Sequence, residues 1–373
     1  MDTIVVVGAG LAGGTAVTQL RELGHDGPIV LFGSEPHAPY ERPPLSKGYL
    51  MGHDPIEKAF VHPPEWYAAH DVDLRTDTTV TGLDLEARLV RTEGGEQGYD
   101  ALVLATGAQP RRLAMADASG ASAYLRTIED SDRLRGAFGP DRRLVVVGAG
   151  WIGLEVAAAA REAGTQVTVY ETAALPLERV LGPRIAQVFA DVHRAHGVDL
   201  RLSTQVTPED LRDAPLVVVG IGAVPQTELA QEAGLEVDNG ILVDACLRTS
   251  RPEVYAIGDV ANQDHPVLGR LRVEHWDTAI EQGKAVAATI LGSDTPYDRM
   301  PYFFTDQYDL GMEYVGRPGP QAQIRIDGQT EDLDALNFRA YWIEDGLVTA
   351  AMHVNDWDSS DTIRAQVGKP LAD

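Results

Sequence analysis

The chain carries the same glycine-rich pattern twice, each time between a short apolar run and an amphipathic segment. Residues 4–7 (IVVV) precede Gly8-Ala9-Gly10-Leu11-Ala12-Gly13, and residues 144–147 (LVVV) precede Gly148-Ala149-Gly150-Trp151-Ile152-Gly153. Apolar spacing typical of a helix follows both turns, over residues 14–24 and 154–164. A buried strand, a GxGxxG turn and a helix begin a βαβ unit of a parallel sheet. The sequence therefore predicts an α/β fold that contains this unit twice.

Each unit continues into a second apolar run that ends in a glutamate. Glu35 follows Gly8 by 35 − 8 = 27 residues, and Glu171 follows Gly148 by 171 − 148 = 23. In such units the first glycine permits a tight turn, the second lets the backbone approach a pyrophosphate, and the third lets the helix pack on the strand. The terminal carboxylate binds the ribose hydroxyls of the adenosine half. Turns that merely pack helix on strand explain the glycines but not the glutamates, so we predict dinucleotide binding at both units.

Length and charge narrow the class of protein. A chain of 373 residues is long enough for two or three domains. Its net charge of 31 − 56 = −25 disfavours nucleic acid and anionic membranes as partners. No apolar run reaches the roughly 18 uninterrupted residues of a membrane span. The first residues, MDTIVVVG, place an acidic residue where a signal peptide carries positive charge, so we expect a cytoplasmic protein.

Two dinucleotide sites in one chain indicate an enzyme that passes a hydride between nicotinamide and flavin. Glu171 favours NADH over NADPH, because a carboxylate binds a free 2′-hydroxyl and repels a 2′-phosphate, and only Arg179 follows nearby as a counter-charge. The single cysteine, Cys246, excludes an internal disulfide and a CxxC redox pair, and we expect it in a surface region between a loop and a strand. Hydride transfer needs alignment and exclusion of water rather than a nucleophile. We predict no metal site.

Further motifs lie between and after the glycine turns: LVLATGAQP at 102–110, LVVVGIGAVPQTELA at 216–230 and LRTSRPEVYAIGDVA at 247–261. In this order they resemble the two-dinucleotide flavoprotein reductases of glutathione-reductase-like fold. PYERPPLSK at 39–47 and RVEHWDTAIEQGKAVA at 272–287 narrow the resemblance to the FAD-dependent, NADH-using ferredoxin reductases of bacterial oxygenase systems. The redox module of apoptosis-inducing factor is also similar. The resemblance extends to about residue 311 and weakens afterwards.

The resemblance implies two Rossmann-like dinucleotide-binding domains and a small C-terminal α/β domain. A discontinuous FAD domain comprises residues 1–108 and 228–297, the NAD domain comprises residues 109–227, and a C-terminal interface domain comprises residues 298–373. In the last of these, three strand-like pieces occur, AQIRID, LNFRAYWI and LVTAAMHV. This domain is shorter than the family leads us to expect.

The resemblance also assigns residues to FAD. Asp259 of the GD motif binds the ribityl or pyrophosphate region, with an ordinary helix N-cap aspartate as the alternative. A helix that begins near Glu274 and runs through residue 292 points its positive end at the flavin, with His275 and Trp276 beside the flavin or nicotinamide ring. A plain core or surface aromatic is the alternative for both. The predicted FAD-binding residues are Gly8, Gly10, Leu11, Ala12, Gly13, Glu35, Arg42, Lys47, Thr106, Gly107, Asp259, His275 and Trp276.

By the same resemblance, Glu155 approaches the hydride-accepting nitrogen of the flavin and pairs with Lys47. A carboxylate in an apolar pocket needs such a partner. Trp151 matches an aromatic residue that covers the flavin until nicotinamide displaces it. The predicted catalytic residues are Lys47, Glu155 and Trp276. The predicted NAD-binding residues are Gly148, Gly150, Trp151, Ile152, Gly153, Glu155, Glu171, Arg179 and Gly222.

The predicted function is transfer of hydride from NADH to FAD and of single electrons from FAD to a ferredoxin-type iron–sulfur protein, by a monomer or a homodimer. Two alternatives stay open: an NADH:quinone or other small-acceptor oxidoreductase, and a slow redox-sensing flavoprotein similar to apoptosis-inducing factor. Ferredoxins are acidic, so the docking face is expected to be basic. The candidates are Arg111, Arg112, Arg270 and Arg272, although the net charge of −25 opposes encounter with an acidic partner.

Overall fold

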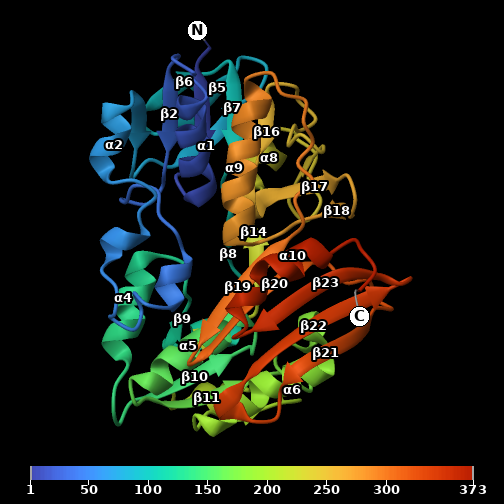
Figure 1. Ribbon diagram of the computed structural model, residues 1–373. Helices are drawn as coiled ribbons and strands as arrows, with labels where there is room; N and C mark the ends of the chain where they lie inside the picture. The colour runs from blue at the N-terminus through green and yellow to red at the C-terminus, as the bar shows by residue number, and fades with distance from the viewer. Residues whose placement is uncertain (1, 372–373) are drawn as a thin grey trace. The chain divides into compact units, whose positions relative to one another are not determined.

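The computed structural model describes residues 2–371, and the chain divides into two compact units, each assembled from separate stretches (Figure 1). Unit 1 comprises Met1–Arg42, Ile56–Gln109 and Val224–Pro301; unit 2 comprises Pro43–Pro55, Pro110–Ala223 and Tyr302–Asp373. This division differs from the predicted domains in two respects. Residues 43–55 belong to unit 2 although the sequence placed them with 1–108, and the C-terminal residues share a unit with 110–223.

Unit 1 is built on a five-stranded parallel sheet in the order β16-β7-β1-β2-β3. Its strands are β1 (Ile4–Val7), β2 (Ile29–Phe32), β3 (Val72–Arg75), β7 (Ala101–Leu104) and β16 (Val254–Ala256). Every residue of β1, β2, β7 and β16 is buried, as expected where both faces of a parallel sheet are covered. The continuous Val, Ile and Leu runs that mark these strands in the sequence therefore form the core of the unit.

Two helices of unit 1 lie side by side, α1 (Leu11–Glu22) and α9 (Trp276–Ile290) (Figure 1). They approach closely because Gly283 of α9 has no side chain: a Cβ atom there would lie 2.9 Å from the carbonyl oxygen of Ala12. The sequence predicted a helix that begins near residue 274 and runs through residue 292. Helix α9 is slightly shorter.

The other elements of unit 1 are smaller. Strands β4 (Val80–Asp84), β5 (Leu89–Thr92) and β6 (Gly95–Gly98) form an antiparallel sheet, and β15 (Ile241–Val243), β17 (Ala261–His265) and β18 (Gly269–Leu271) form a mixed one. The helices are η2 (Ile56–Ala59), α2 (Pro64–Ala69), α8 (Glu228–Glu232) and η3 (Gly258–Val260). Strands β8 (Ala108–Pro110) and β14 (Ala223–Pro225) pair with each other where the chain passes between units.

Unit 2 repeats the parallel arrangement in the order β12-β11-β10-β13-β9. Its strands are β9 (Ser122–Ala123), β10 (Arg143–Val147), β11 (Gln166–Tyr170), β12 (Asp199–Arg201) and β13 (Val217–Val219). Its helices are η1 (Pro43–Ser46), α3 (Ala114–Ser119), α4 (Ile128–Ala137), α5 (Trp151–Glu162), α6 (Glu178–Ala195) and α7 (Pro208–Leu211). Two parallel sheets with helices confirm the predicted α/β class.

The C-terminal part of unit 2 is a five-stranded antiparallel sheet in the order β19-β20-β23-β22-β21. Its strands are β19 (Tyr302–Gln307), β20 (Leu310–Gly316), β21 (Gln323–Gln329), β22 (Asn337–Glu344) and β23 (Leu347–Val354), followed by η5 (Trp357–Ser359) and α10 (Ser360–Gln366), with η4 (Leu333–Ala335) before β22. The last three strands coincide with the predicted pieces. The β19-β20 hairpin was not predicted.

Across residues 2–371, no helix combines the length and the apolar character that crossing a membrane requires.

Candidate active site

The first glycine turn follows β1 and uses its three glycines in two different ways. A Cβ atom at Gly8 would clash with the carbonyl oxygen of Ala105, and one at Gly13 would clash with the carbonyl oxygen of Gly8. Packing alone therefore requires both of these glycines, and Gly8 also has a φ of +117°. Gly10 is different, because a Cβ atom there would meet nothing within 4 Å. The open space at the middle glycine fits close approach of a pyrophosphate, and no packing role explains it.

The second turn, after β10, has the same geometry. A Cβ atom at Gly148 would clash with the carbonyl oxygen of Gly220, and one at Gly153 would clash with that of Gly148. At Gly150 the nearest atom would be the Gly220 oxygen, at 3.7 Å. The alternative that these glycines only pack helix on strand thus accounts for two of the three in each turn. The middle glycine of each turn has no packing role and leaves space in which a ligand can approach the backbone.

Four of the other residues predicted for FAD in unit 1 follow the carboxyl ends of neighbouring strands of one sheet. Glu35 comes after β2, Thr106 and Gly107 after β7, and Asp259 after β16. Loops at the carboxyl ends of adjacent parallel strands meet at one edge of the sheet, which is where nucleotides bind in such folds. Glu35 lies three residues beyond the end of β2, whereas the sequence placed it at the end of the strand.

Glu35 and Arg42 are in direct contact. The Arg42 Nη2 atom lies 2.8 Å from Glu35 Oε1, and the Tyr40 hydroxyl donates to Glu35 Oε2 at 2.5 Å. Arg42 Nη1 is also 3.0 Å from the Tyr40 hydroxyl. Both charged side chains remain partly exposed, at 26% for Arg42 and 29% for Glu35, so a ligand can reach the pair. The structure therefore brings together two of the residues predicted to bind FAD.

His275 and Trp276 stand at the beginning of α9. His275 caps the helix, since its Nδ1 accepts a hydrogen bond from the Asp277 backbone N–H at 3.3 Å. Trp276 interacts with Glu41, a residue that sequence reasoning missed. Burial raises the pKa of the Glu41 carboxyl, and the interaction with Trp276 offsets part of that rise. Trp276 is thus held in place at the N-terminus of the helix.

Glu171 follows β11 directly and holds the second glycine turn. Its Oε2 accepts a hydrogen bond from the Ala149 N–H at 2.7 Å, and its Oε1 accepts from the Ala173 N–H at 2.8 Å. Arg179, the second residue of α6, is solvent-exposed, and so are Ile152 and Gly222. Gly222 has a φ of +99° and faces open space. The carboxylate is therefore fixed beside the middle of the turn.

Lys47 and Glu155 form a buried ion pair in unit 2. Lys47 Nζ lies 2.6 Å from Glu155 Oε1, and the side chains are 15% and 3% exposed. Glu155 belongs to α5 and Lys47 follows η1. Two further donors complete the coordination of the carboxylate: Ser46 Oγ donates to Oε2 at 2.5 Å, and Thr305 Oγ1 donates to Oε1 at 2.6 Å. The pairing implied by the resemblance is present, and the charge is compensated as burial requires.

Sequence reasoning missed Ser46 and Thr305 as partners of Glu155. Ser46 directly precedes Lys47 in PPLSK, so the motif contained the signal. Thr305 lies on β19, in a hairpin that was not predicted.

Trp151, the first residue of α5, packs in an aromatic cluster of unit 2. Its ring centroid is 4.4 Å from that of Phe303 on β19 and 6.1 Å from that of Phe189 on α6. The side chain is only partly buried. Trp151, which was predicted to cover the flavin, therefore packs against other aromatic side chains on one side and stays accessible on the other.

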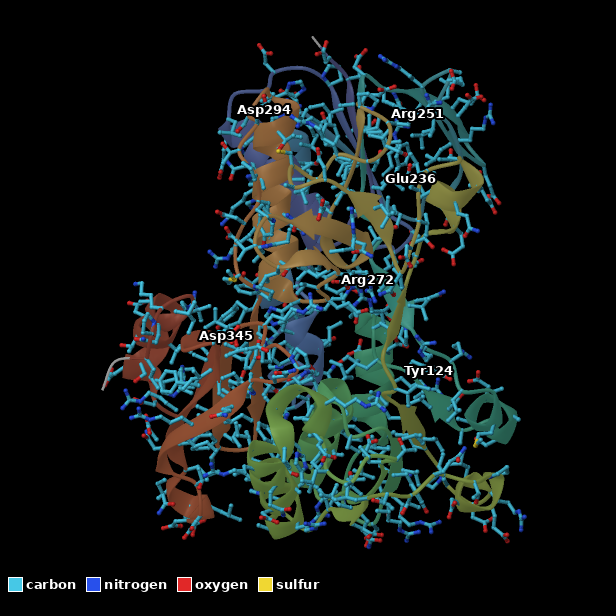
Figure 2. The ribbon with its side chains drawn as sticks, turned by 90° about the vertical axis from the view of Figure 1, so that its right-hand side faces the viewer. Tyr124, Glu236, Arg251, Arg272, Asp294 and Asp345 are labelled. Carbon is cyan, nitrogen blue, oxygen red and sulfur yellow. The ribbon has the colours of Figure 1, made fainter. Side chains whose placement is uncertain are left out.

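Three of the four arginines predicted for a docking face, Arg112, Arg270 and Arg272, make side-chain contacts within their own units. Arg112 pairs with Asp117 at 3.0 Å, and Arg270 Nη1 donates to the carbonyl oxygens of Val243 at 2.9 Å and Asn262 at 2.7 Å. Arg272, labelled in Figure 2, pairs with Glu274. These contacts give each of the three a structural role, and they weaken the assignment of a docking face to them.

Cys246 corrects one prediction. The sequence suggested a surface position, but the side chain is buried, with 8% exposure, in the turn after β15. Its thiol lies 3.7 Å from the Asp294 carbonyl oxygen. The reason is the adjacent Leu247, which is fully buried in the core of unit 1 and draws the turn inward. In the described part of the chain, no three His, Cys, Asp or Glu side chains are grouped to hold a metal ion.

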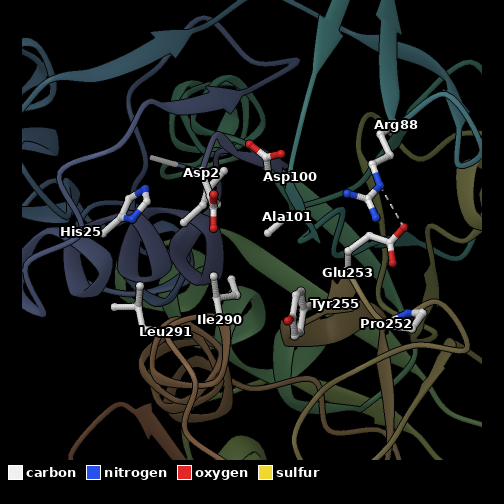
Figure 3. Close-up of a pocket in the computed structure, with 11 residues that line it drawn as sticks. Asp2, His25, Arg88, Asp100, Ala101, Pro252, Glu253, Tyr255, Ile290 and Leu291 are labelled. Carbon is white, nitrogen blue, oxygen red and sulfur yellow. Dashed lines mark ion pairs between the residues drawn. The ribbon is translucent and has the colours of Figure 1, made fainter.

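A cavity of about 360 Å³ lies elsewhere in unit 1 (Figure 3). Its lining includes Asp2 and Asp100, which precede β1 and β7, and the Arg88–Glu253 ion pair at 3.3 Å. It therefore lies at the amino ends of the strands, away from the glycine turn, and none of the predicted site residues lines it.

Comparison with known proteins identifies the class. Residues 2–283 match the family model described as pyridine nucleotide-disulphide oxidoreductase. The chain is 37% identical to putidaredoxin reductase CamA of Pseudomonas putida, over 95% of this chain and 89% of the relative. It is 41% identical to the ferredoxin--NAD(+) reductase component of the anthranilate 1,2-dioxygenase system of Burkholderia cepacia, over 95% and 91%. The crystal structure of the covalent putidaredoxin reductase–putidaredoxin complex matches with a TM-score of 0.91 at 36% identity, covering 98% of this chain and 93% of that one.

The chain therefore belongs to the pyridine nucleotide-disulphide oxidoreductase family. Within this family it is a member of the FAD-dependent, NADH-using ferredoxin reductases, an oxidoreductase whose cofactors are FAD and NAD(H). The predicted family, fold class, enzyme class and cofactors are confirmed. The two open glycine turns and the carboxylates beside them fit two dinucleotides.

Proposed function

We propose that this protein takes a hydride from NADH onto FAD and passes the electrons singly to a ferredoxin-type iron–sulfur protein. The observation that carries the proposal is the repetition, in one chain, of a parallel sheet whose glycine turn leaves its middle glycine open. The relatives named above, a putidaredoxin reductase and a ferredoxin--NAD(+) reductase, support the choice of acceptor.

Unit 1 would hold FAD and unit 2 would hold NADH. The first glycine turn, Glu35, Arg42 and Asp259 would bind the adenosine and pyrophosphate parts of FAD, and Trp276 would lie beside its ring. The second turn and Glu171 would bind NADH. When bound, FAD supplies the capacity to accept two electrons as hydride and to release them one at a time.

The chain's own residues would position the reactants and exclude water. The Lys47–Glu155 pair is already buried and fully coordinated, so it needs no reorganisation when nicotinamide arrives. No dithiol can relay the electrons, because the chain has one cysteine and that residue is buried in unit 1. Electrons would pass directly from the cofactor to an external acceptor.

A second candidate acceptor is a quinone or another small molecule. The net charge of −25 and the internal contacts of Arg112, Arg270 and Arg272 favour it, since an acidic ferredoxin gains no obvious attraction from them. The dependence on NADH suggests a cytoplasmic location, which cell fractionation with an antibody would test.

Stopped-flow absorbance separates these functions. The FAD-loaded protein is mixed with NADH without oxygen and then with a ferredoxin from an oxygenase system plus cytochrome c, with a quinone, or with air. Fast cytochrome reduction that requires ferredoxin supports the proposal. Equally fast oxidation by quinone alone supports the second candidate. Slow turnover with every acceptor, together with altered sedimentation, supports a redox sensor. A protein that cannot bind FAD contradicts all three.

A further inference from the structure

A line of buried polar side chains continues from Glu155 into the interior of unit 2. It runs from Thr305 and Gln307 on β19 to His193 on α6. Thr305 and His193 are 0% exposed and Gln307 is 1% exposed. Thr305 and Gln307 share one face of β19 because side chains alternate along a strand, while Asp306 between them is exposed. Neither His193 nor Gln307 has a place in the function proposed above.

The distances show a continuous chain of hydrogen bonds. Thr305 Oγ1 lies 2.6 Å from Glu155 Oε1, Gln307 Nε2 lies 3.1 Å from Thr305 Oγ1, and His193 Nε2 lies 2.8 Å from Gln307 Oε1. The Tyr308 hydroxyl is 3.5 Å from His193 Nδ1. Buried polar groups that are fully satisfied in this way fix one arrangement of the core.

The chemistry of the groups sets the direction of every bond. The Glu155 carboxylate, paired with Lys47, only accepts, so the single proton of the Thr305 hydroxyl points to it. Thr305 Oγ1 must then accept from the amide NH₂ of Gln307, which turns the Gln307 carbonyl toward His193. His193 must therefore carry its proton on Nε2. Every donor in the line points toward Glu155.

We propose that His193 and Gln307 are positioning residues that act through Thr305 to fix the Glu155 carboxylate for hydride transfer. This inference rests on the proposed function. Thr305 and Lys47 both contact Oε1 and Ser46 contacts Oε2, so both oxygens are held and the carboxylate cannot rotate without breaking a bond. Donors that point the same way also polarise one another and strengthen the last bond of the line. Burial lowers the pKa of His193 to about 4, so the ring is neutral, as the line requires.

Matched variants at Thr305 test the positioning role. Thr305→Val keeps the shape and removes the hydroxyl, whereas Thr305→Ser keeps the hydroxyl. Thr305→Val is expected to slow the limiting rate of flavin reduction by NADH about tenfold, through misalignment, with an unchanged Kd for NADH. Thr305→Ser is expected to stay within about twofold of the parent. Equal limiting rates in the Val variant and the parent would overturn the proposal.

A double-mutant cycle tests whether His193 acts through Thr305. His193→Phe fills the site without a ring N–H and is expected to slow reduction by a smaller factor than Thr305→Val. Because Thr305→Val already breaks the line, adding His193→Phe should slow the reaction no further. Multiplicative effects would show that His193 acts by another route and would contradict the proposal.

A third measurement needs neither turnover nor bound flavin. In apoprotein labelled with ¹⁵N-histidine, NMR at pH 7.5 should show His193 protonated on Nε2 and unprotonated on Nδ1, with the signal assigned by its loss in His193→Phe. The opposite tautomer, or a charged ring, would overturn the proposal even if the Thr305 variants fail to fold. If the parent protein is not reduced by NADH while this tautomer is observed, the proposed function fails and the geometry of the line stands.

Discussion

Lys47 and Glu155 form a 2.6 Å ion pair in which the carboxylate is almost fully buried and the ammonium is only slightly exposed. The glutamate belongs to the helix that follows the second glycine turn, and the lysine belongs to the proline-rich segment PYERPPLSK. Such proline-rich composition is common in flexible linkers. Here the segment contains the helix η1, and the ion pair of Lys47 with Glu155 holds it in place. Its prolines restrict the backbone where alignment matters.

Replacing the lysine should leave a buried charge without its cation. We expect Lys47→Ala to lower the free energy of unfolding by roughly 3 to 5 kcal/mol and to slow reduction by NADH or weaken FAD binding. Thermal unfolding, flavin content and stopped-flow reduction measure these effects. In the control, Lys47→Met combined with Glu155→Gln should recover stability but not the reduction rate. Unchanged kinetics and flavin content in Lys47→Ala would return the segment to a merely structural role.

The first glycine turn offers a matched pair of alanine substitutions. Gly13→Ala forces a Cβ atom onto the carbonyl oxygen of Gly8, so we expect loss of folded protein. Gly10→Ala meets no atom within 4 Å, so the fold should persist while FAD affinity falls at least about tenfold. Circular dichroism and flavin fluorescence report the two properties. Full FAD affinity in Gly10→Ala would mean that the pyrophosphate does not approach this turn.

Glu171 should decide between the two nicotinamide cofactors. In Glu171→Gln the amide oxygen can still accept the hydrogen bond from Ala149, but the negative charge is gone. We expect the preference for NADH over NADPH, measured as a ratio of kcat/KM values, to fall about tenfold. Glu171→Ala also removes the support of the turn and should raise KM for both cofactors. An unchanged ratio in Glu171→Gln would place the 2′-hydroxyl elsewhere.

His193 should make stability depend on pH. Its pKa is about 4 in the folded protein, below the ordinary value of 6.5, because the ring is buried. Between pH 6.5 and about pH 4, the His193 ring binds a proton in the unfolded chain but not in the folded chain. The free energy of unfolding therefore falls as the pH is lowered through this range. Between pH 7 and pH 5 this contribution is about 2 kcal/mol. Urea unfolding measures the free energy of unfolding of the parent and of His193→Phe at both pH values. The difference between the two proteins should change by about 2 kcal/mol between pH 7 and pH 5. Parallel pH profiles would contradict it.

The glycine units could be predicted because their signal is local. Strand β1 was predicted at its observed bounds, and β10 and β11 to within one residue, since buried parallel strands appear as short runs rich in Val and other apolar or β-branched residues. The roles of Gly8 and Gly13 follow from the same few residues.

What could not be predicted depends on contacts between distant parts of the chain. Strand β19 (YFFTDQ) turns Thr305 and Gln307 inward, where polar side chains usually signal a solvated face. Only the presence of Glu155 and His193 opposite makes their burial favourable. Glu41 was missed for a similar reason, because it interacts with Trp276, far along the chain.

The carboxylate of Glu155 has consequences for how the protein is made. Glu155 lies in residues 110–223, whereas its partners Ser46, Lys47 and Thr305 come from residues 43–55 and 302–373. During synthesis the ribosome releases Lys47 and Glu155 long before Thr305, so the nascent chain carries a partly coordinated charge until β19 emerges. Fragments that end before residue 305 should therefore be poorly soluble targets for proteases, and maturation of this site must wait for the synthesis of β19.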